Sequence, residues 1–249
     1  VAVFAVAIQL SILYMSFSTS ISGVFLPKVT QMVAVGNDRK EISDLFIRTG
    51  RIQYMVMVLI LSGFTVFGRD FIRLWAGEGY SETYVIAMIF FFSLTIPMIQ
   101  NLGVTILQAR NQMKFRSLLY LFIAGISLYL QIVLSRKYGG LGCSLAIAVA
   151  LLVGQGLIMN FYYHFKQGLD IISFWKEILK MSVIPFVLSV LFIGLRRFVS
   201  MDSWPSLLMG IGGFLLIYLP LFACYGLNAY ERSLFMAPLC MIKRKIQDD

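Results

Sequence analysis

The sequence predicts an all-α, polytopic membrane bundle of about seven transmembrane helices. Hydrophobic residues make up 59% of its 249 residues and charged residues only 13%, with a mean hydropathy of +0.83. A soluble domain carries roughly 25% charged residues, about twice the fraction found here. A chain with this much apolar surface requires lipid as its solvent. The apolar runs are long and do not alternate as barrel strands do, which favours helices.

The runs follow one another along the whole chain. A spanning helix needs about 20 mostly apolar residues. Such runs occupy residues 2–26, 51–72, 83–107, 117–135, 140–161, 181–198 and 205–226. None carries a charge near its middle, and short connections join them. Because backbone groups in lipid must be hydrogen-bonded within helices, we expect residues 1–249 to form a single compact transmembrane lobe.

Small residues and prolines predict local features of these helices. In the fifth run, small residues recur at every fourth position: Gly142, Ala146, Ala150 and Gly154. This spacing predicts that another helix approaches the backbone closely. Prolines inside the runs, such as Pro97, predict kinks.

Two of the connections are amphipathic. Residues 37–50 place Ile42, Leu45 and Phe46 on one helical face, and residues 168–181 do the same with other large apolar side chains. Both segments suit short helices that lie on the membrane surface. The alternative is that each is an extension of the neighbouring transmembrane helix.

The distribution of positive charge predicts the orientation. Fifteen of the 21 lysines and arginines fall in the connections on one side of the seven runs, and six fall on the other. Cytoplasmic loops carry the excess of Lys and Arg. We therefore expect the N-terminus of this sequence outside and its C-terminus in the cytoplasm.

The composition argues against several classes of protein. A net charge of +9 would suggest nucleic acid for a soluble domain, but here it follows the topology, so we expect no nucleic-acid partner. Three scattered cysteines and the single His164 form no metal-ligand spacing, so we expect neither a metal nor another cofactor. No nucleophile motif, phosphate loop or carboxylate pair is present, and we expect no enzymatic activity.

Polar side chains recur on single faces of four runs. Polar groups in lipid are costly, so such faces tend to border a hydrated path. Interhelical hydrogen bonding explains the same pattern, and the sequence leaves both readings open. The candidates for a substrate path are Gln9, Ser16, Ser20, Gln100, Asn101, Thr105, Gln108, Gln131 and Gln155.

Several segments together resemble a known family. They are "GVFLPKVTQMV" (23–33), "RTGRIQYMVMVLILSGFTVFGRDFIRLWAGEGY" (48–80), "IPMIQNLGVTILQARNQMKFRS" (96–117) and "YGGLGCSLAIAVALLVGQGLIMNFYYHFKQGLDI" (138–171). In order and spacing these segments resemble the C-terminal half of bacterial polysaccharide (oligosaccharide-lipid) flippases of the MOP superfamily, which includes the MATE-like transporters. The resemblance covers most of residues 1–180.

The resemblance implies one lobe of a two-lobed MATE-like transporter. Such a protein flips undecaprenyl-pyrophosphate-linked oligosaccharide from the cytoplasmic to the outer leaflet by alternating access. Its partners would be the lipid-linked oligosaccharide, the lipids of a bacterial cell membrane and a polysaccharide assembly machinery. Because the chain begins at Val1 within an apolar pattern, we expect that an N-terminal lobe is missing from it.

The resemblance also implies an anion site, yet no Lys or Arg lies deep in any run. The candidates for pyrophosphate capture are therefore Arg51, Arg110 and Lys114 at the expected cytoplasmic mouth. Arg binds phosphate with two parallel hydrogen bonds, and Lys binds it as a point charge. The alternative is that these residues follow the positive-inside rule and contact lipid headgroups.

Two other functions remain as alternatives. A cation-coupled exporter of drugs or small molecules belongs to the same superfamily but would need an ionisable residue within a span. A polytopic membrane enzyme of polysaccharide assembly would need a large external loop or paired His, Asp or Glu residues. Neither feature is visible in this sequence.

Overall fold

The structure is a computed structural model that describes residues 2–35, 39–196, 201–228 and 231. Within these ranges all regular structure is helical, as predicted. The chain forms two compact units, Val1–Ile178 and Leu179–Asp249, which are described separately. That all seven spans form one lobe therefore stays a prediction.

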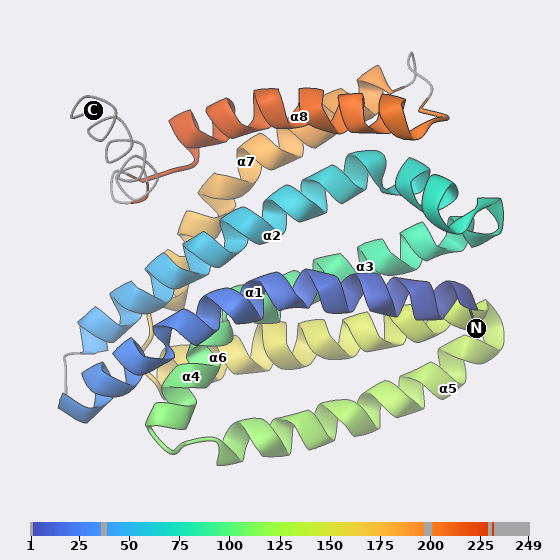
Figure 1. Cartoon of the computed structure of the whole chain (residues 1–249). Helices are drawn as coiled ribbons and strands as arrows, with labels where there is room; N and C mark the ends of the chain where they lie inside the picture. Colours follow the sequence, from blue (N-terminus) through green and yellow to red (C-terminus); the bar gives the residue numbers. More distant parts are fainter. Residues whose placement is uncertain (1, 36–38, 197–200, 229–230, 232–249) are drawn as a thin grey trace, which may run out of the picture. The chain divides into compact units, whose positions relative to one another are not determined.

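Figure 1 shows the helices in chain order. The first unit contains α1 (Ala2–Val35), α2 (Arg39–Ala76), the 3₁₀ turn η1 (Glu78–Tyr80), α3 (Ser81–Ile99), α4 (Asn101–Ala109), α5 (Lys114–Leu151), the π-helical segment η2 (Leu152–Ile158) and α6 (Met159–Phe165). Helix α7 (Ile171–Leu195) begins in the first unit and continues into the second, and α8 (Trp204–Tyr225) follows it. Six helical segments of the described chain are long and apolar enough to cross a membrane.

One of these six segments, Lys114–Phe165, contains two passes. Its helix turns back at Gly139, where φ is +55° and ψ is −131°, a conformation that glycine adopts without a steric penalty. Figure 1 shows the chain reversing direction within α5. A Cβ atom on Gly142 would collide with the backbone carbonyl of Leu134, eight residues earlier, which a straight helix could not allow. The reversal separates the predicted runs 117–135 and 140–161.

The core of the first unit lies between α1, α2 and α3. Helix α1 packs against α3 and α4, and α2 packs against α3. The ring of Tyr14 on α1 stacks on Phe91 of α3 at 4.3 Å, and its hydroxyl lies 2.7 Å from the hydroxyl of Thr95. Both side chains are buried, so this contact joins the two helices inside the core.

The stripe of small residues in the second limb of α5 is buried, as its spacing predicts. Gly142, Ala146, Ala150 and Gly154 all lie inside the unit. A Cβ atom on Gly154 would collide with the side chain of Ile123 on the first limb. The missing side chain therefore lets the two limbs approach each other at this point.

Both amphipathic connections are extensions of transmembrane helices, the second of the two readings. Residues 39–50 continue directly into α2, and residues 171–181 form the beginning of α7. Their apolar faces pack on the protein: the rings of Phe46 and Phe174 are 5.0 Å apart, and Tyr163 lies beside Phe46 at 6.1 Å. The face predicted to rest on lipid thus forms an aromatic cluster at this end of the first unit.

The positively charged connections of the first unit meet at one end. Arg110, after α4, donates hydrogen bonds to Gln167, after α6. The backbone N–H of Asp170 donates to the hydroxyl of Ser43 near the start of α2, at 2.8 Å. The sequence placed these connections on the same side of the bundle, and within this unit that placement is confirmed.

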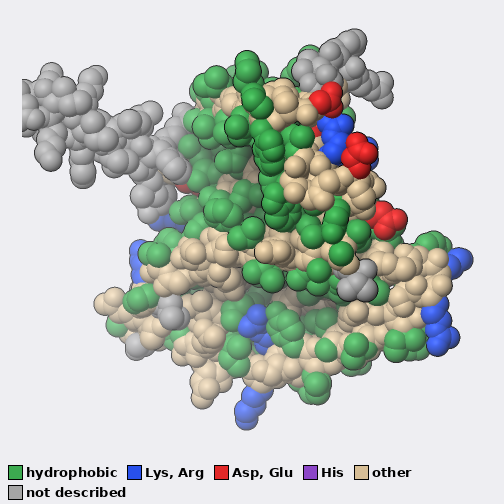
Figure 2. All heavy atoms as spheres, turned by 45° about the vertical axis from the view of Figure 1, so that its right-hand side comes forward, with side chains coloured by type: hydrophobic (Ala, Val, Ile, Leu, Met, Phe, Trp, Pro, Cys, Tyr) green, Lys and Arg blue, Asp and Glu red, His purple; other side chains and the backbone are tan. Residues whose placement is uncertain are grey.

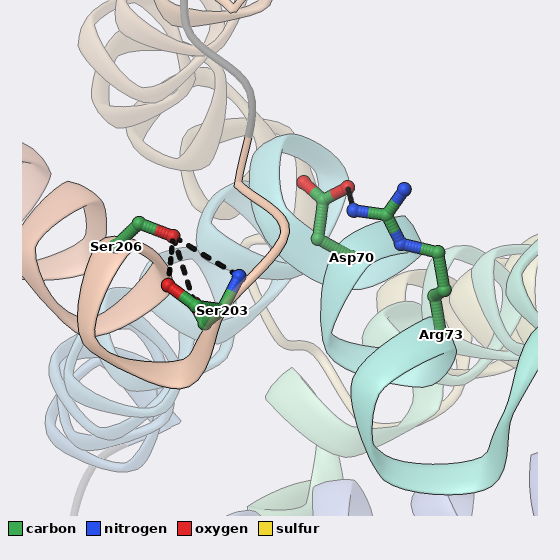
Figure 3. A network of polar contacts seen from close by, with 4 residues as sticks. All are labelled: Asp70, Arg73, Ser203 and Ser206. Atoms are coloured by element: carbon green, nitrogen blue, oxygen red, sulfur yellow. Dashed lines mark hydrogen bonds and ion pairs between the residues drawn. The ribbon is translucent and has the colours of Figure 1, made fainter.

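Two helix ends carry local polar contacts, each within its own unit (Figure 3). At the end of α2, Arg73 lies 3.5 Å from the carboxylate of Asp70, one helical turn earlier. At the start of α8, Ser203 and Ser206 form a capping box, which supplies partners for backbone N–H groups that have none inside the helix. In the second unit the rings of Phe192 on α7 and Phe214 on α8 meet edge to face at 5.1 Å.

Apolar side chains cover much of the surface, as a lipid environment requires. Figure 2 shows hydrophobic side chains over a large part of the face in view, and charged side chains at few places on it. Leu121 on α5 is 73% exposed and Phe186 on α7 is 70% exposed. Such extensive apolar exposure, on helices long enough to span a bilayer, identifies a multi-pass membrane protein.

Candidate functional site

Helix α3 ends in the middle of an apolar run, and α4 starts two residues later. The residue between them, Gln100, has φ −106° and ψ +12°, outside the helical range. Pro97 lies just before the break, where its ring and its missing N–H disturb the helical hydrogen bonds. The predicted kink is thus a break. On the α1 side the hydroxyl of Ser18 donates to the carbonyl of Met98 at 2.7 Å, which also accepts from the backbone N–H of Gln100.

The side chain of Gln100 joins three helices at the break. It is 3% exposed, and its Nε2 donates to Oδ1 of Asn160 on α6 at 2.7 Å. The indole Nε1 of Trp175 on α7 donates to the same oxygen at 3.1 Å. The Nδ2 group of Asn160 donates in turn to the carbonyl of Gly156. We call Gln100, Asn160 and Trp175 the Gln100 cluster.

A π-helical segment borders the Gln100 cluster. Gln155 lies in η2 (Leu152–Ile158), and its carbonyl accepts a hydrogen bond from Asn160 at 3.4 Å. Its side chain is 5% exposed, and its Nε2 has no hydrogen-bond partner among the described residues. π-Helical turns and buried polar atoms without partners are both features that concentrate at functional sites.

Arg51 forms a buried ion pair. Its Nη1 lies 2.5 Å from Oε2 of Glu177 on α7, and the two side chains are 3% and 24% exposed. Removing one partner of such a pair leaves a charge in a poor dielectric, so each residue depends on the other. The sequence proposed Arg51 as a free cation for an anionic substrate. The structure instead pairs it with a carboxylate that the sequence analysis did not select.

Arg110 fastens one connection to another. Its Nη1 donates to the backbone carbonyl of Gln167 at 3.0 Å and to the side-chain oxygen at 2.8 Å, and Gln167 donates to Gln112 at 2.7 Å. Burial, and secondarily the charge of Arg39, hold the pKa of Arg110 below its ordinary value. Of the three proposed capture residues, only Lys114 has an exposed side chain.

The polar stripe of α1 lies on the exposed face of the helix. Gln9, Ser16 and Ser20 are all exposed. The hydroxyls of Ser16 and Ser20 donate to carbonyls of their own helix, at 2.7 and 2.8 Å. These three residues therefore line the surface of the first unit and do not join its helices.

A different set of α1 side chains forms interhelical hydrogen bonds. The Nε2 group of Gln53 on α2 donates to the hydroxyls of Ser18 and Ser22, at 3.1 and 2.5 Å. All three residues are buried. None of them is among the predicted path residues, although Ser18 and Ser22 each lie two positions away from a predicted serine.

The remaining candidates are dispersed. Thr105 is buried, Asn101 is half-buried and Gln108 is exposed on α4. Gln131 is half-buried and donates to Ser127 of its own helix at 3.0 Å. Of the nine predicted path residues, Gln100 and Gln155 come from different runs and share a hydrogen-bond partner, Asn160.

Asn160, Trp175 and Glu177 complete the site and were missed by the sequence analysis. Asn160 was detectable as an amide near the end of the fifth run. Trp175 and Glu177 gave no such signal, because they lie on an amphipathic segment whose pattern describes only its apolar face.

Comparison with known proteins adds no assignment. The chain matches no model of a protein family, no curated protein and no solved structure at a significant level.

Proposed function

We propose that this chain belongs to a transporter that flips an undecaprenyl-pyrophosphate-linked oligosaccharide across a bacterial cell membrane. Transport would proceed from the cytoplasmic to the outer leaflet by alternating access, with the positively charged end of the first unit in the cytoplasm. The order and spacing of the family-like segments support this proposal. So do two features of the structure, and the exposed polar stripe of α1 carries the most weight.

The stripe supports the proposal because lipid is a poor environment for it. An exposed Gln9 on a transmembrane helix would leave an amide in hydrocarbon, at a cost of several kcal/mol by the order of magnitude for unsatisfied polar groups. Water or a polar substrate along this face removes the cost. Transporters built from two repeats bind their substrates between them, and this face of α1 would line such an interface.

The break between α3 and α4 is the second supporting feature. Discontinuous helices in transporters supply polar backbone groups near the substrate and points of bending. Here the Gln100 cluster ties the break to α6 by hydrogen bonds, and Asn160 has two neighbouring acceptors, the carbonyls of Gln155 and Gly156. In this proposal, α4 and α6 move relative to α3 during transport, with Gln100 as the pivot.

The test uses glycines that have open space around them. A Cβ on Gly23 of α1, or on Gly194 of α7, would meet no atom within 4 Å. Gly23→Trp would place a bulky ring on the stripe, whereas Gly194→Trp is the matched control. Each full-length variant is expressed in a cell that lacks its own polysaccharide flippase, and surface polymer is measured at equal amounts of membrane-inserted protein.

We expect the unmodified protein and Gly194→Trp to restore surface polymer, and Gly23→Trp to restore none. Restoration by all three would remove the α1 face from the path. No restoration across several polymer types would reject the flippase itself.

A cation-coupled exporter is the second candidate. The Arg51–Glu177 pair favours it, because it places an ionisable, 24% exposed carboxylate against a buried guanidinium. Resistance to toxic cations in the same cells, without surface polymer and lost on Glu177→Gln, would support the exporter.

A further inference from the structure

The first limb of α5 carries an open apolar groove. Its volume is about 1050 Å³, just above the range of about 300–1,000 Å³ for pockets that hold small molecules. Its walls include Phe115, Leu118, Phe122, Gly125, Ile126 and Tyr129. The groove extends along α5 from Phe115 to Leu130, roughly 22 Å at 1.5 Å per residue. That length exceeds half of a hydrocarbon core of about 30 Å.

The groove is held open by contacts at one edge of α5. The rings of Phe115 and Tyr162 stack at 4.1 Å, and they fix the start of α5 to α6. Further along, Ile123 is buried against Gly154. The walls of the groove are themselves uncovered: Leu118 is 68% exposed and Tyr129 is 69% exposed.

One end of the groove is positively charged. Lys114 directly precedes Phe115. It also lies four residues before Leu118, a spacing that places both side chains on the face of α5 that carries the groove. Lys166 follows Tyr162 by one turn, beside the same aromatic stack. Both lysine side chains are exposed.

The segment of the chain that forms the groove carries charge of one sign only. Residues 83–169, which contain both limbs of α5 together with η2 and α6, hold six Lys and Arg residues and no Asp or Glu. An apolar groove with cations at one end is complementary to a lipid chain whose headgroup is anionic.

We propose that this groove binds an anionic phospholipid of the surrounding membrane. One acyl chain lies along the groove from Phe115 toward Leu130, and the phosphate lies between Lys114 and Lys166. This assignment gives Lys114 a lipid ligand rather than the substrate pyrophosphate. It is independent of the proposed transport function.

The test measures lipid selectivity at the groove. The full chain is reconstituted in vesicles of phosphatidylcholine with phosphatidylglycerol, and one of the two lipids carries brominated chains that quench tryptophan. In a chain whose native Trp75, Trp175 and Trp204 are replaced by Phe, Phe122→Trp reports on the groove. Phe17→Trp, at a 49% exposed position on α1, reports on the ordinary lipid contact of the same unit.

We expect brominated phosphatidylglycerol to quench more strongly than brominated phosphatidylcholine in Phe122→Trp, and the two lipids to quench equally in Phe17→Trp. Each lysine should contribute about fivefold, that is about 1 kcal/mol per Lys near anionic lipid. The double change Lys114→Gln and Lys166→Gln should therefore abolish the preference. Arg136→Gln with Lys137→Gln, the matched change beyond the other end of the limb, should leave it intact.

A groove-filling change separates the chain site from the headgroup site. A Cβ on Gly125 would meet no atom within 4 Å, so Gly125→Leu fits without a clash and fills the groove. It should reduce quenching by both lipids at position 122, whereas Gly194→Leu should not. Equal selectivity at both reporters would overturn the proposal. Loss of selectivity in the variant of Arg136 and Lys137, but not in the variant of Lys114 and Lys166, would also overturn it. So would the formation in vesicles of a dimer of the chain that shields position 122 from both lipids.

Discussion

The members of the Gln100 cluster should depend on one another for their contribution to the free energy of unfolding. In Asn160→Leu, a side chain of similar size removes the oxygen that accepts from Gln100 Nε2 and from Trp175 Nε1. Gln100 is 3% exposed, so its amide would lose its partner inside the bundle. Leaving a buried donor without a partner costs about 1–3 kcal/mol.

The environment sets where in this range the cost falls. Interhelical hydrogen bonds within membranes average about 0.6 kcal/mol, because the unfolded helices also find partners. Trp175 is only half-buried and can turn to water, so its lost bond adds little. We therefore expect Asn160→Leu to lower the free energy of unfolding by about 1–2 kcal/mol.

The double variant provides the sharper test. In Gln100→Leu with Asn160→Leu the buried donor of Gln100 is removed together with its acceptor, and only the half-buried Trp175 loses a partner. The loss should therefore be smaller than the sum of the two single losses by about 0.5–2 kcal/mol. The assay is reversible unfolding of the full chain in mixed micelles, followed by helical circular dichroism. Gln131→Leu is the control, because Gln131 bonds only within its own helix among the contacts found, and it should be close to neutral.

Two results would refute this reasoning. Strict additivity of Gln100→Leu and Asn160→Leu would mean that the 2.7 Å hydrogen bond carries no energy. A loss for Gln131→Leu as large as for Asn160→Leu would mean that any polar-to-apolar change in the bundle has the same effect.

Two further predictions concern the end of the first unit where the connections meet. In Gly103→Ala the added Cβ would overlap the ring of Tyr163, and such overpacking costs about 1–3 kcal/mol of the free energy of unfolding. The midpoint of thermal unfolding should therefore fall. In the control Gly194→Ala the added Cβ has open space, and the midpoint should not fall. Hydrogen bonds from Ser173 hold the pKa of Asp170 below its ordinary value. Because the pKa of Asp170 is lower in the folded state, its stabilisation is present above the ordinary pKa of Asp and disappears as the pH falls through the folded pKa. Asp170→Ala should lower the free energy of unfolding by about 1 kcal/mol at pH 7 and remove this acid dependence from unfolding curves. An unchanged dependence at acid pH would contradict the prediction.

The fold class could be read from the sequence because the lipid leaves few alternatives. Hydropathy fixes where a chain can span, and backbone hydrogen bonding then requires helices. The reversal at Gly139 was visible as a gap between two runs around Arg136 and Lys137. The break at Gln100 was not, since Pro97 predicts a disturbance of the helix but not whether it bends or ends there.

The candidate site was harder to predict because hydropathy treats all polar residues in a span alike. Ser16 and Ser18 differ by two positions in the same helix, yet one is exposed and the other is buried and donates to the carbonyl of Met98 beside the break. Which of them faces a neighbour depends on the rotation of α1, and its apolar residues are spread all around the helix. Without a one-sided apolar face, the sequence contains no signal for that rotation.

This division into bonded and exposed polar residues bears directly on function. Gln53, Gln100 and Asn160 are hydrogen-bonded between helices, so a substrate can reach them only if those bonds open. Gln9 is exposed without any such rearrangement. In the proposed transporter, a substrate path along the first unit should therefore begin at α1, and the Gln100 cluster should matter for the change of conformation rather than for first contact. The two roles predict different kinetics: changes at Gln9 should alter the apparent affinity for substrate, whereas changes at Asn160 should alter the rate of turnover.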